Sequence, residues 1–396
     1  MTAKAIIRGL REAEKAVRAM GGQGFVASED YRGACRNTAA QVLRERMEAH
    51  VSAHLVQCAR TKRADRRNGS YTRHVLTEMG DLHLQVPRSR LYAPVEVLQA
   101  YARRADSVNR MILACFVLGL STRKVAKALL PVLGEAVSPA TVSRIAKTLD
   151  SAVAAFHCRK LQDRYRLLVF DGVVLTHKTG MGALRRPVLV VLGVLLDGRK
   201  EVIDFRQAPA ESQAAWEAFL NDLYRRGLTG QNAELAVSDG GKGLLAALPL
   251  VYPHLPVQRC WAHKTRNLLD KCRKADWPLV KCDLHRISRA ANRTQARRAA
   301  ARFAQRWQAL YPKAVACLRV DLDELLAFYV FDHQAWRKAA RTTNAIERRF
   351  REVRRRTRPM GVMADRTSAE RILFAVFTNE NHAQGVAPIF ALTHNS

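Results

Sequence analysis

The sequence predicts an α/β fold in which a five-stranded sheet is interrupted by an all-helical insertion and preceded by a mainly helical region. Two observations predict it. Between Tyr165 and Cys260, short apolar runs alternate with amphipathic segments in the order β-β-β-α-β-α-β. Residues 261–340 then have helical periodicity, and a further amphipathic helix begins near Arg341. At 396 residues the chain exceeds a single compact core, so roughly two to four domains are expected.

The net charge separates this chain from an average globular protein. It has 66 Lys and Arg against 35 Asp and Glu, a formal charge of +31, with an ordinary 48% of hydrophobic residues. Such an excess favours a polyanionic partner. Nucleic acid fits better than a membrane, because the chain has no run of about 18 apolar residues. Its start lacks the apolar core of a signal peptide and its eight cysteines are scattered, so we expect a reduced, cytoplasmic, nucleoid-associated protein.

The N-terminal region predicts helices followed by a small basic module. Residues 1–60 have apolar positions at helical spacing. The basic segment Arg60–His74 carries Asn68-Gly69, which predicts a turn, and Asp81–Val86 alternates as a strand that Pro87 should end. The module is either a solvated linker or a DNA contact, and the overall charge favours the contact. Its basic residues are Arg60, Lys62, Arg63, Arg66, Arg67 and Arg73.

A pair of short helices follows an apolar helix that ends near Gly119. The pair covers Thr122–Leu133 and Pro139–Leu149, and Ser138 is placed to cap the second helix. This pair resembles a helix-turn-helix, whose second helix enters a major groove. Two antiparallel helices of a bundle give much the same signal. In the DNA-binding interpretation the contacting side chains are Arg123, Lys124, Thr141, Ser143, Arg144 and Lys147.

Two aspartates come directly after apolar strands and are followed by glycine. Asp171 comes after the first strand of the sheet and Asp239 after the fourth. Sites form at the carboxyl edge of an open α/β sheet, so neighbouring first and fourth strands would bring the two carboxylates together. Carboxylates at that distance repel unless a cation lies between them. Mg²⁺ needs only one or two protein carboxylates, and two such ions about 4 Å apart suit phosphodiester transfer.

The amphipathic helix that begins near Arg341 carries a third acid. Its apolar stripe is Ile346, Phe350 and Val353, its cap is Thr343 or Asn344, and it should end at Pro359 and Gly361. Glu347 lies beside the stripe in the first turn and could complete a metal site. Glu352 points elsewhere and is read as charge balance. The arginines either contact phosphates or form a solvated face; they are Arg348, Arg351, Arg354, Arg355 and Arg358.

Four segments closely resemble motifs of the Mutator-type transposases of bacterial insertion sequences, insertion sequence family 256. They are FDGVVL, VSDGGKGL, QRCWAHKTRNLLDK and TTNAIERRFREVRRRTRPMG. The resemblance covers most of the chain. It implies a ribonuclease H-like core with a mixed five-stranded sheet, and a DDE triad of Asp171, Asp239 and Glu347 that binds two Mg²⁺ ions, for which Mn²⁺ can substitute. It also places a Cys-x-x-His pattern near the active site, here Cys260 and His263.

The residues alone leave other interpretations of this cysteine and histidine open. Cys260-x-x-His263 and Cys282-x-x-His285 have the spacing of zinc ligands. An unbroken helix would hold these pairs roughly 30 Å apart, whereas a break at Pro278 would allow them to meet. Alternatively, His263 orients a carboxylate or a phosphate, or the cysteine and histidine are a packed structural pair.

Two tryptophans and one His-Lys pair also stand out. Trp307 and Trp336 in the insertion are expected in its core, with stacking on an unpaired base as the alternative. His177 and Lys178, shortly after Asp171, could contact a phosphate.

Together these features predict a transposase that binds the terminal inverted repeats of its element. It would cleave a strand with metal-activated water and transfer the resulting 3′-hydroxyl to target DNA, without a covalent protein intermediate. The resemblance implies at least a homodimer on double-stranded DNA and no small-molecule cofactor. The alternatives are a DNA-binding repressor from an inactive copy and a ribonuclease H-like nuclease. The expected domains are an N-terminal module (1–105), a helix-turn-helix-like region (106–160), the first part of the core (161–263), the insertion (264–340) and the rest of the core (341–396).

Overall fold

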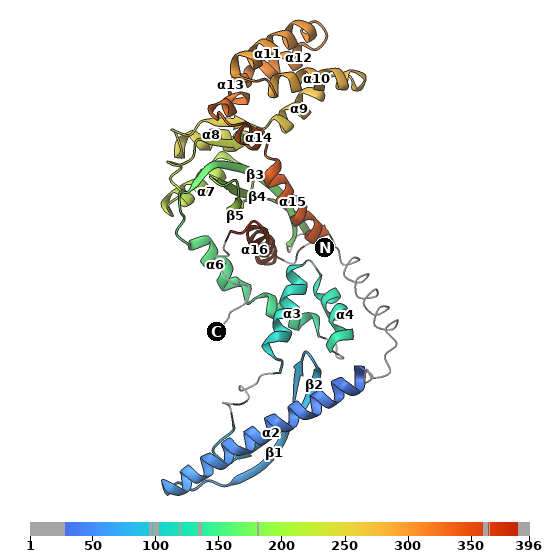
Figure 1. The fold of residues 1–396 in the computed structure, drawn as a ribbon, viewed down its shortest axis with the longest axis vertical. Helices are drawn as coiled ribbons and strands as arrows, with labels where there is room; N and C mark the ends of the chain where they lie inside the picture. The colour runs from blue at the N-terminus through green and yellow to red at the C-terminus, as the bar shows by residue number, and fades with distance from the viewer. Residues whose placement is uncertain are drawn as a thin grey trace. The chain divides into compact units, whose positions relative to one another are not determined.

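The computed structural model describes residues 28–94, 97, 103–118, 120–133, 137–179, 182–358, 363 and 365–386 (Figure 1). The chain divides into two compact units. The first contains the described residues up to Ala114 together with Thr122–Val142, and the second contains Cys115–Ser121 and the described residues from Ser143 onward. The finer division into five domains stays a prediction.

The first unit is built on one long helix and a two-stranded hairpin. Helix α2 covers Ser28–Arg60, and strands β1 (Arg67–Thr77) and β2 (Gly80–Ser89) pair in antiparallel fashion. Alternate residues of β2 face α2, because successive strand side chains point to opposite sides. Their core consists of Met47, Val75, Leu82, Leu84 and Val86. Helices α3 (Asp106–Val117) and α4 (Thr122–Leu133) follow.

Two details of the predicted N-terminal module are wrong. Asn68-Gly69 is not a turn between elements but lies inside β1, where the pairing register shifts between Arg67 and Ser70 and Gly69 has a φ of +67°. Glycine adopts this backbone conformation without strain, which suits an irregularity within a strand as well as a turn. Pro87 does not end β2 either. A two-stranded ribbon has two free edges, so a proline without an N–H is tolerated there.

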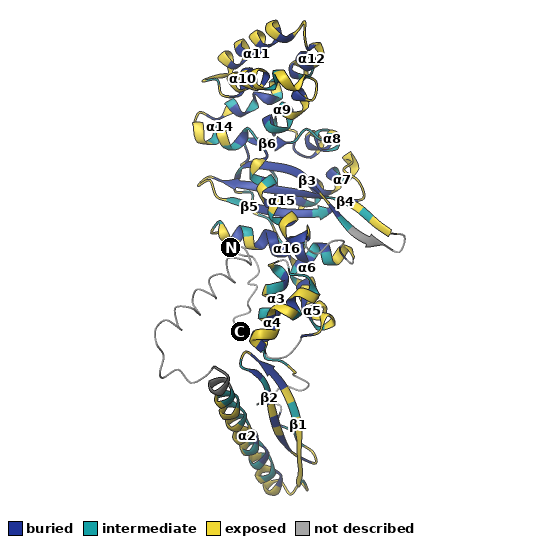
Figure 2. Ribbon diagram, turned by 90° about the vertical axis from the view of Figure 1, so that its right-hand side faces the viewer, coloured by how far each residue is buried: buried dark blue, intermediate teal, exposed yellow. Residues whose placement is uncertain are grey.

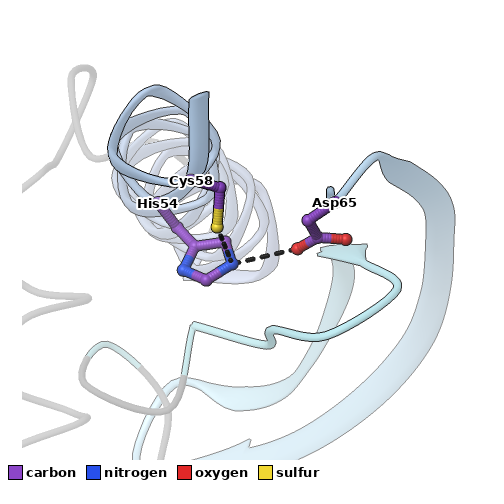
Figure 3. Close-up of side chains that lie close together, drawn as sticks. All are labelled: His54, Cys58 and Asp65. Carbon is purple, nitrogen blue, oxygen red and sulfur yellow. Dashed lines mark hydrogen bonds and ion pairs between the residues drawn. The ribbon is translucent and has the colours of Figure 1, made fainter. Parts of the chain in front are cut away.

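A cluster of His54, Cys58 and Asp65 fastens α2 to the hairpin (Figure 3). His54 Nε2 lies 2.9 Å from Asp65 Oδ2, and Cys58 Sγ lies 3.4 Å from His54 Nε2. Asp65 also accepts hydrogen bonds from the Ser89 hydroxyl and, at 2.7 Å, from the backbone N–H of Arg66. These bonds join the end of the helix to both strands.

The second unit contains the five-stranded sheet that the sequence predicts. Its strands are β3 (Tyr165–Thr179), β4 (Gly182–Leu195), β5 (Lys200–Gln207), β6 (Leu235–Ser238) and β7 (Val257–Arg259), in the spatial order β5-β4-β3-β6-β7. The pairs β3–β4 and β4–β5 are antiparallel, while β3–β6 and β6–β7 are parallel. The sheet is therefore mixed, and the chain order β-β-β-α-β-α-β is confirmed.

Helices cover both faces of this sheet. Helices α7 (Gln213–Arg225) and α8 (Lys242–Val251) pack on the face that carries Leu168 and Phe170 of β3. On the opposite face, Phe205 of β5 contacts Phe377 of α16 (Arg366–Ala383), with ring centroids 5.4 Å apart. Most residues of the central strands are buried, as the dark colour of β3 and β4 in Figure 2 indicates.

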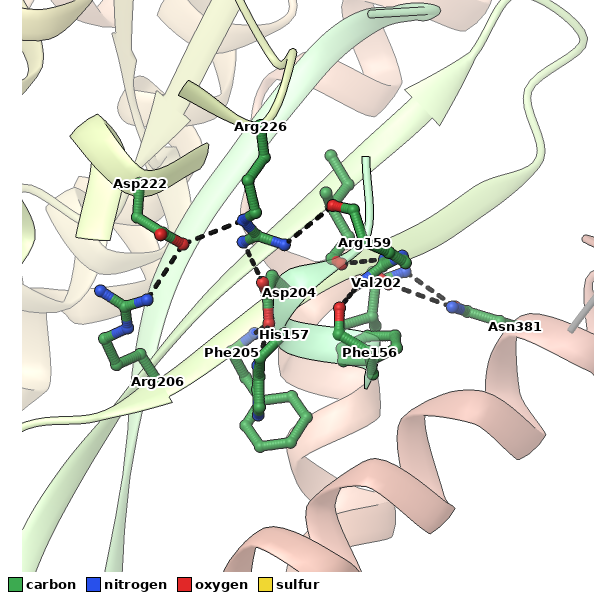
Figure 4. Close-up of polar contacts among 11 residues, drawn as sticks. Phe156, His157, Arg159, Val202, Asp204, Phe205, Arg206, Asp222, Arg226 and Asn381 are labelled. Carbon is green, nitrogen blue, oxygen red and sulfur yellow. Dashed lines mark hydrogen bonds and ion pairs between the residues drawn. The ribbon is translucent and has the colours of Figure 1, made fainter. Parts of the chain in front are cut away.

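The edge strand β5 is covered by side chains rather than by another strand (Figure 4). The Asn381 side chain accepts a hydrogen bond from the Val202 N–H at 2.7 Å and donates one to the Val202 carbonyl at 3.0 Å. Beside it, the fully buried Asp204 accepts from His157 Nδ1 at 2.7 Å and pairs with Arg226. Both arrangements satisfy groups that an open edge would leave unpaired.

Residues between the sheet and α15 (Asn344–Thr357) fold only into helices among the described elements. They are α9 (Trp261–Leu269), η1 (Lys274–Asp276), α10 (Trp277–Ser288), α11 (Arg293–Trp307), α12 (Pro312–Val320), α13 (Leu322–Leu325), η2 (Ala327–Val330) and α14 (Gln334–Ala340). The two ends of the insertion lie side by side, because the Trp261 N–H donates to the Arg341 carbonyl at 2.9 Å.

Trp307 and Trp336 of the insertion are packing residues. Trp307 is buried and its indole N–H donates to Asp283 Oδ2 at 3.0 Å. The half-buried Trp336 lies against Phe331, with the Arg166 guanidinium 4.8 Å from its ring centroid. No helix in the described part of the chain is long and apolar enough to cross a membrane.

The second of the two predicted DNA-reading helices is shorter than predicted. Helix α5 covers Pro139–Ala146, and α6 starts separately at Leu149 and runs to Cys158. The Ser138 hydroxyl accepts a hydrogen bond from the Thr141 N–H at 3.1 Å, so the predicted cap of α5 is confirmed. Gly119 and Gly134 lie outside the described residues.

Candidate active site

Asp171 lies inside a strand rather than after one. The prediction that its strand ends at Phe170 is wrong, because β3 continues to Thr179 through antiparallel pairing with β4. The parallel partner β6, however, stops at Ser238, which pairs with Phe170. Asp171 is therefore the first residue of β3 beyond the end of β6, and its side chain is only 5% exposed.

Asp239 follows the last residue of β6, so the register brings the two aspartates to the same end of one parallel strand pair. The glycines after each aspartate bind its carboxylate: the Gly172 N–H donates to Asp171 Oδ1 at 2.8 Å, and the Gly241 N–H donates to Asp239 Oδ1 at 2.9 Å. Gly240, between Asp239 and Gly241, has a φ of +97°, a conformation that favours glycine. The prediction that the first and fourth strands are neighbours is confirmed.

The charges around Asp171 destabilise its ionised form. Burial and the charge of Asp239 raise the pKa of Asp171 to about 7, and Glu347 adds to the increase. The Gly172 N–H and His263 oppose it. Three carboxylates thus act on one another, and the His263 imidazole opposes them at Asp171, which is the electrostatic setting of a cation site.

Glu347 is carried by α15, which packs against β3. The apolar stripe predicted for this helix is confirmed, since Ile346, Phe350 and Val353 are all at most 1% exposed. Glu347 Oε1 lies 3.6 Å from His263 Nε2 on α9. The Cys260 thiol raises the pKa of His263 to about 9, with help from Asp171 and Asp239, although burial lowers it. A protonated His263 would therefore face the acids.

Cys260 holds the start of α15 in place. Its sulfur accepts hydrogen bonds from the Thr343 N–H at 3.3 Å and the Thr343 hydroxyl at 3.4 Å, and its own N–H donates to the Ser238 carbonyl at 2.7 Å. Thr343 occupies the predicted cap position, but its side chain binds this sulfur instead of capping the helix. One residue therefore joins the end of β6 to the first turn before Glu347.

The arginines of α15 and of the residue after it fall into two groups. The proposed phosphate-binding residues Arg348, Arg351, Arg354, Arg355 and Arg358 are exposed. Arg349 and Arg356 are only 6% exposed each. Glu352 pairs with Arg355 at 2.9 Å and with Arg356 at 2.7 Å, as expected of an acid that balances charge.

The other predicted contacts lie on the hairpin, on α4 and on or just after α5. Arg66 is exposed, whereas Arg67 is bound to α2 through Glu48 Oε2 at 2.6 Å and Ser52. On α4, at the end of α5 and just after it, the exposed candidates are Arg123, Lys124, Ser143, Arg144 and Lys147, while Thr141 is half-buried. The side chains of His177 and Lys178, and residues Pro359 and Gly361, lie outside the described residues.

The zinc interpretation is not borne out among the described residues. The helix is indeed broken before Pro278, yet Cys260, His263, Cys282 and His285 do not gather. Within that part of the chain, three ligand atoms come within 4.8 Å of one another only in His54–Cys58–Asp65 and His74–Asp81–His83. Asp171, Asp239 and Glu347 do not converge that closely either, so cations between them would also need oxygen ligands from water or a substrate.

Sequence reasoning missed a fourth carboxylate, Glu211, in the loop between β5 and α7. Burial and the charge of Asp239 raise the pKa of Glu211, while the Trp216 indole N–H opposes the increase. That indole nitrogen is buried and meets no acceptor with full hydrogen-bond geometry. The only signal in the sequence is an acid immediately before the helix cap Ser212, which is common at helix starts.

A basic cleft of about 740 Å³ lies beside α15. Its cationic lining residues are Lys200, Arg289, Lys338, Arg341, Arg348 and Arg349. Burial, with the charges of Arg349 and Arg348, lowers the pKa of Lys200, and burial lowers that of Arg341. These cations crowd one another, so an anion in the cleft would relieve their repulsion.

The sequence of this chain is similar to known proteins over most of its length. Residues 11–385 match the family model described as "Transposase, Mutator family". The chain is 34% identical to the transposase for insertion sequence element IS905 of Lactococcus lactis over 320 residues, 80% of each chain. It is 30% identical to that for ISRM5 of Rhizobium meliloti, covering 87% of this chain and 88% of the relative. It is 31% identical to that for IS256 in transposon Tn4001 of Staphylococcus aureus, covering 79% and 80%.

Proposed function

Because the chain belongs to the Mutator family of insertion-sequence transposases, we propose that it is an active DNA transposase with a ribonuclease H-like core. It binds the terminal inverted repeats of its element, cleaves a strand and joins the free 3′-hydroxyl to target DNA. Asp171, Asp239 and Glu347 form its DDE triad. Two copies at least act together, one on each end of the element.

The observation that carries this proposal is the gathering of acids at one strand end: Asp171 and Asp239 lie at the same end of the parallel pair β3 and β6, and Glu347 acts on Asp171 from α15. A buried carboxylate normally has a cation or several donors, but Asp171 faces two further acids. Mg²⁺ or Mn²⁺ would remove this repulsion, and carboxylate oxygens are the ligands that these ions prefer. The residues present therefore fit divalent cations, held by Asp171, Asp239 and Glu347. When bound, such ions activate the attacking oxygen and stabilise charge on the leaving oxygen.

The protein groups around the acids have separate tasks. Cys260 fixes α15 against the end of β6, so Glu347 stays opposite the two aspartates. The His263 imidazolium, 3.6 Å from Glu347, orients that carboxylate and adds positive charge near the scissile phosphate. The buried faces of β3 and α15 exclude water from one side of the site.

Arginines would hold the DNA beside the acids. The basic cleft and the exposed face of α15 supply the contacts to the phosphate backbone near the cleavage point. End recognition is assigned to α4, α5 and the basic hairpin. Phosphate contacts release counterions, so binding should weaken steeply as salt is raised.

The test is strand cleavage and joining on a labelled duplex that carries the element's own end, in Mg²⁺ or Mn²⁺. Wild type is compared with Asp171→Ala, Asp239→Ala and Glu347→Ala, and Glu352→Ala is the matched control on the same helix. We expect metal-dependent cleavage to be lost in the first three, with end binding retained, and kept in the control.

Other outcomes would redirect the assignment. Cleavage that survives in Glu347→Ala but not in Glu352→Ala would show that the third acid is wrong. Binding of the end without any cleavage by the wild type would favour a repressor. Cleavage of duplexes regardless of the terminal sequence, without joining, would favour a nuclease.

A further inference from the structure

Three glycines, one in β3 and two at the start of α8, lie against Glu211. A Cβ atom added to Gly172 of β3 would lie 3.3 and 3.4 Å from the two carboxylate oxygens of Glu211. A Cβ added to Gly241 would lie 3.4 Å from Glu211 Oε1. At Gly243 of α8 it would clash with the backbone, 2.9 Å from the Glu211 carbonyl oxygen and 2.7 Å from the Ser212 carbonyl carbon.

The carboxylates of Glu211 and Asp239 both lie beside Gly241. The point beside Gly241 that lies 3.4 Å from Glu211 Oε1 lies 3.3 Å from Asp239 Oδ1. Asp171 reaches the same strand end from the opposite face of β3, since side chains of residues 171 and 172 point to opposite sides. Asp239 therefore has Asp171 on one face of β3 and the loop residue Glu211 over the other face.

A simpler explanation covers only part of this arrangement. Glu211 precedes Ser212, whose hydroxyl caps α7 by accepting from the Ala215 N–H at 3.3 Å, and acids are favourable at helix starts. That explains why an acid is tolerated in the loop. It does not explain why the carboxylate of this exposed residue lies over two glycines and near another carboxylate, where it meets repulsion.

Building on the proposed function, we propose that Glu211 is a fourth carboxylate ligand of the catalytic site, binding a divalent cation together with Asp239. The glycines at 172 and 241 keep the space for its side chain, and the packing of Gly243 on its backbone fixes the loop. The three named DDE acids then hold the cations from the α15 side and from the strand ends, and Glu211 holds them from the α7 side.

The proposal is tested by calorimetric titration of the full-length, DNA-free protein with Mn²⁺. Glu211→Gln removes the charge and keeps the shape, and we expect its Kd for Mn²⁺ to rise about tenfold or more. Glu217→Gln removes the same charge from the adjoining helix and should bind Mn²⁺ as the wild type does. A wild-type Kd in Glu211→Gln, with the fold intact by circular dichroism, would overturn the proposal.

Two further variants separate a ligand from a merely structural residue. Glu211→Asp keeps a carboxylate and should recover part of the affinity. Gly172→Ala leaves all acids present but pushes on the Glu211 carboxylate, so it should weaken Mn²⁺ binding in the same direction. In the Glu211→Gln background the alanine should have little additional effect, because neighbours that act through one group are not additive. Full additivity would contradict a shared mechanism.

The same titration distinguishes failure here from failure of the proposed function. If Asp171→Asn and Asp239→Asn weaken Mn²⁺ binding while Glu211→Gln does not, only the role of Glu211 is wrong. If none of the three weakens it, the metal site itself is wrong, and with it the proposed chemistry. Cleavage rates measured at rising Mn²⁺ provide the second readout: excess metal should restore Glu211→Gln partially and Asp171→Asn not at all.

Discussion

Asp204 and Asp171 are both buried carboxylates of the same sheet, and their surroundings differ in sign. Burial would raise the pKa of Asp204, but His157, Arg226 and Arg159 outweigh it and hold that pKa below its ordinary value. Burial and two neighbouring acids raise the pKa of Asp171. Asp204 carries its counter-charges within the chain. Asp171 has His263 against two neighbouring acids, and a site short of counter-charge is prepared for a cation from solution.

The largest contrast is expected in catalysis. Asp171→Asn should reduce single-turnover strand cleavage by about 10³-fold or more, because it removes a proposed ligand of the cations that stabilise the reacting phosphate. Asp204→Asn should leave the cleavage rate per folded molecule near the wild-type value. The measurement is product formation on the labelled terminal duplex at saturating protein. Equal losses in the two variants would remove the distinction between the two carboxylates.

Stability should show the opposite ranking. Asp204→Asn removes a fully buried charge that His157 and Arg226 face, leaving Asp222 as the partner of Arg226, and should lower the free energy of unfolding by about 3–5 kcal/mol. Asp171→Asn in metal-free protein should raise it, since a repelling charge is removed. Denaturant unfolding of both variants in the presence of a chelator checks this. An Asp171→Asn protein that is less stable than the wild type without metal would refute the repulsion.

The pH dependence should separate the two groups further. A raised pKa means that the folded state binds a proton more tightly than the unfolded state, so the contribution of Asp171 to stability falls as pH rises from about 4 to about 7. Each unit of raised pKa corresponds to about 1.4 kcal/mol. The stabilisation by Asp171→Asn should therefore grow over this range in metal-free protein. Asp204, with its lowered pKa, stabilises the fold above the pKa of an unfolded aspartate and loses that effect as pH falls.

Saturating Mg²⁺ should abolish the pH-dependent difference at Asp171, because a bound cation replaces the proton. The same measurement at Asp204 serves as the control, since its counter-charges are covalently part of the chain. A pH-dependent gain that persists unchanged in Mg²⁺ would mean that the ion does not bind at Asp171.

The smallest effect is expected at Glu352, which shares α15 with Glu347. Glu352 has arginine partners at 2.7 and 2.9 Å, so Glu352→Gln should lower the free energy of unfolding by only about 0.5 kcal/mol and change cleavage less than twofold. Glu347, whose neighbour is His263 at 3.6 Å, should lose cleavage and almost no stability when changed to Gln. Thermal midpoints and cleavage rates of the pair sharpen the comparison between neutralised and exposed acids on one helix.

The sequence could predict the order of the strands, the two aspartates and the apolar stripe of α15, because each depends on local periodicity or on one topological rule. It could not predict that β3 continues past Asp171, since the antiparallel pairing with β4 that extends it is a long-range contact. Asn68-Gly69 has the pattern of a turn, and only its partner strand reveals an irregularity within β1.

The parts of the site that were missed have no local pattern. Glu211 becomes significant only when the bare backbone of Gly172 and Gly241 is seen beside it. The Thr343 hydroxyl was expected to cap its own helix, but a sulfur from a distant strand end competes for it. Both contacts depend on which distant elements pack together, and no short sequence motif predicts that packing.

The insertion leaves and rejoins the sheet at hydrogen-bonded neighbours, Trp261 and Arg341, and this has a consequence for how the family can vary. A segment whose two ends are joined can grow, shrink or be replaced without changing the position of what comes after it. The position of Glu347 is thus independent of the length of the polypeptide that precedes it. Residues 264–340 could therefore be exchanged as a cassette while Glu347 keeps its place near His263.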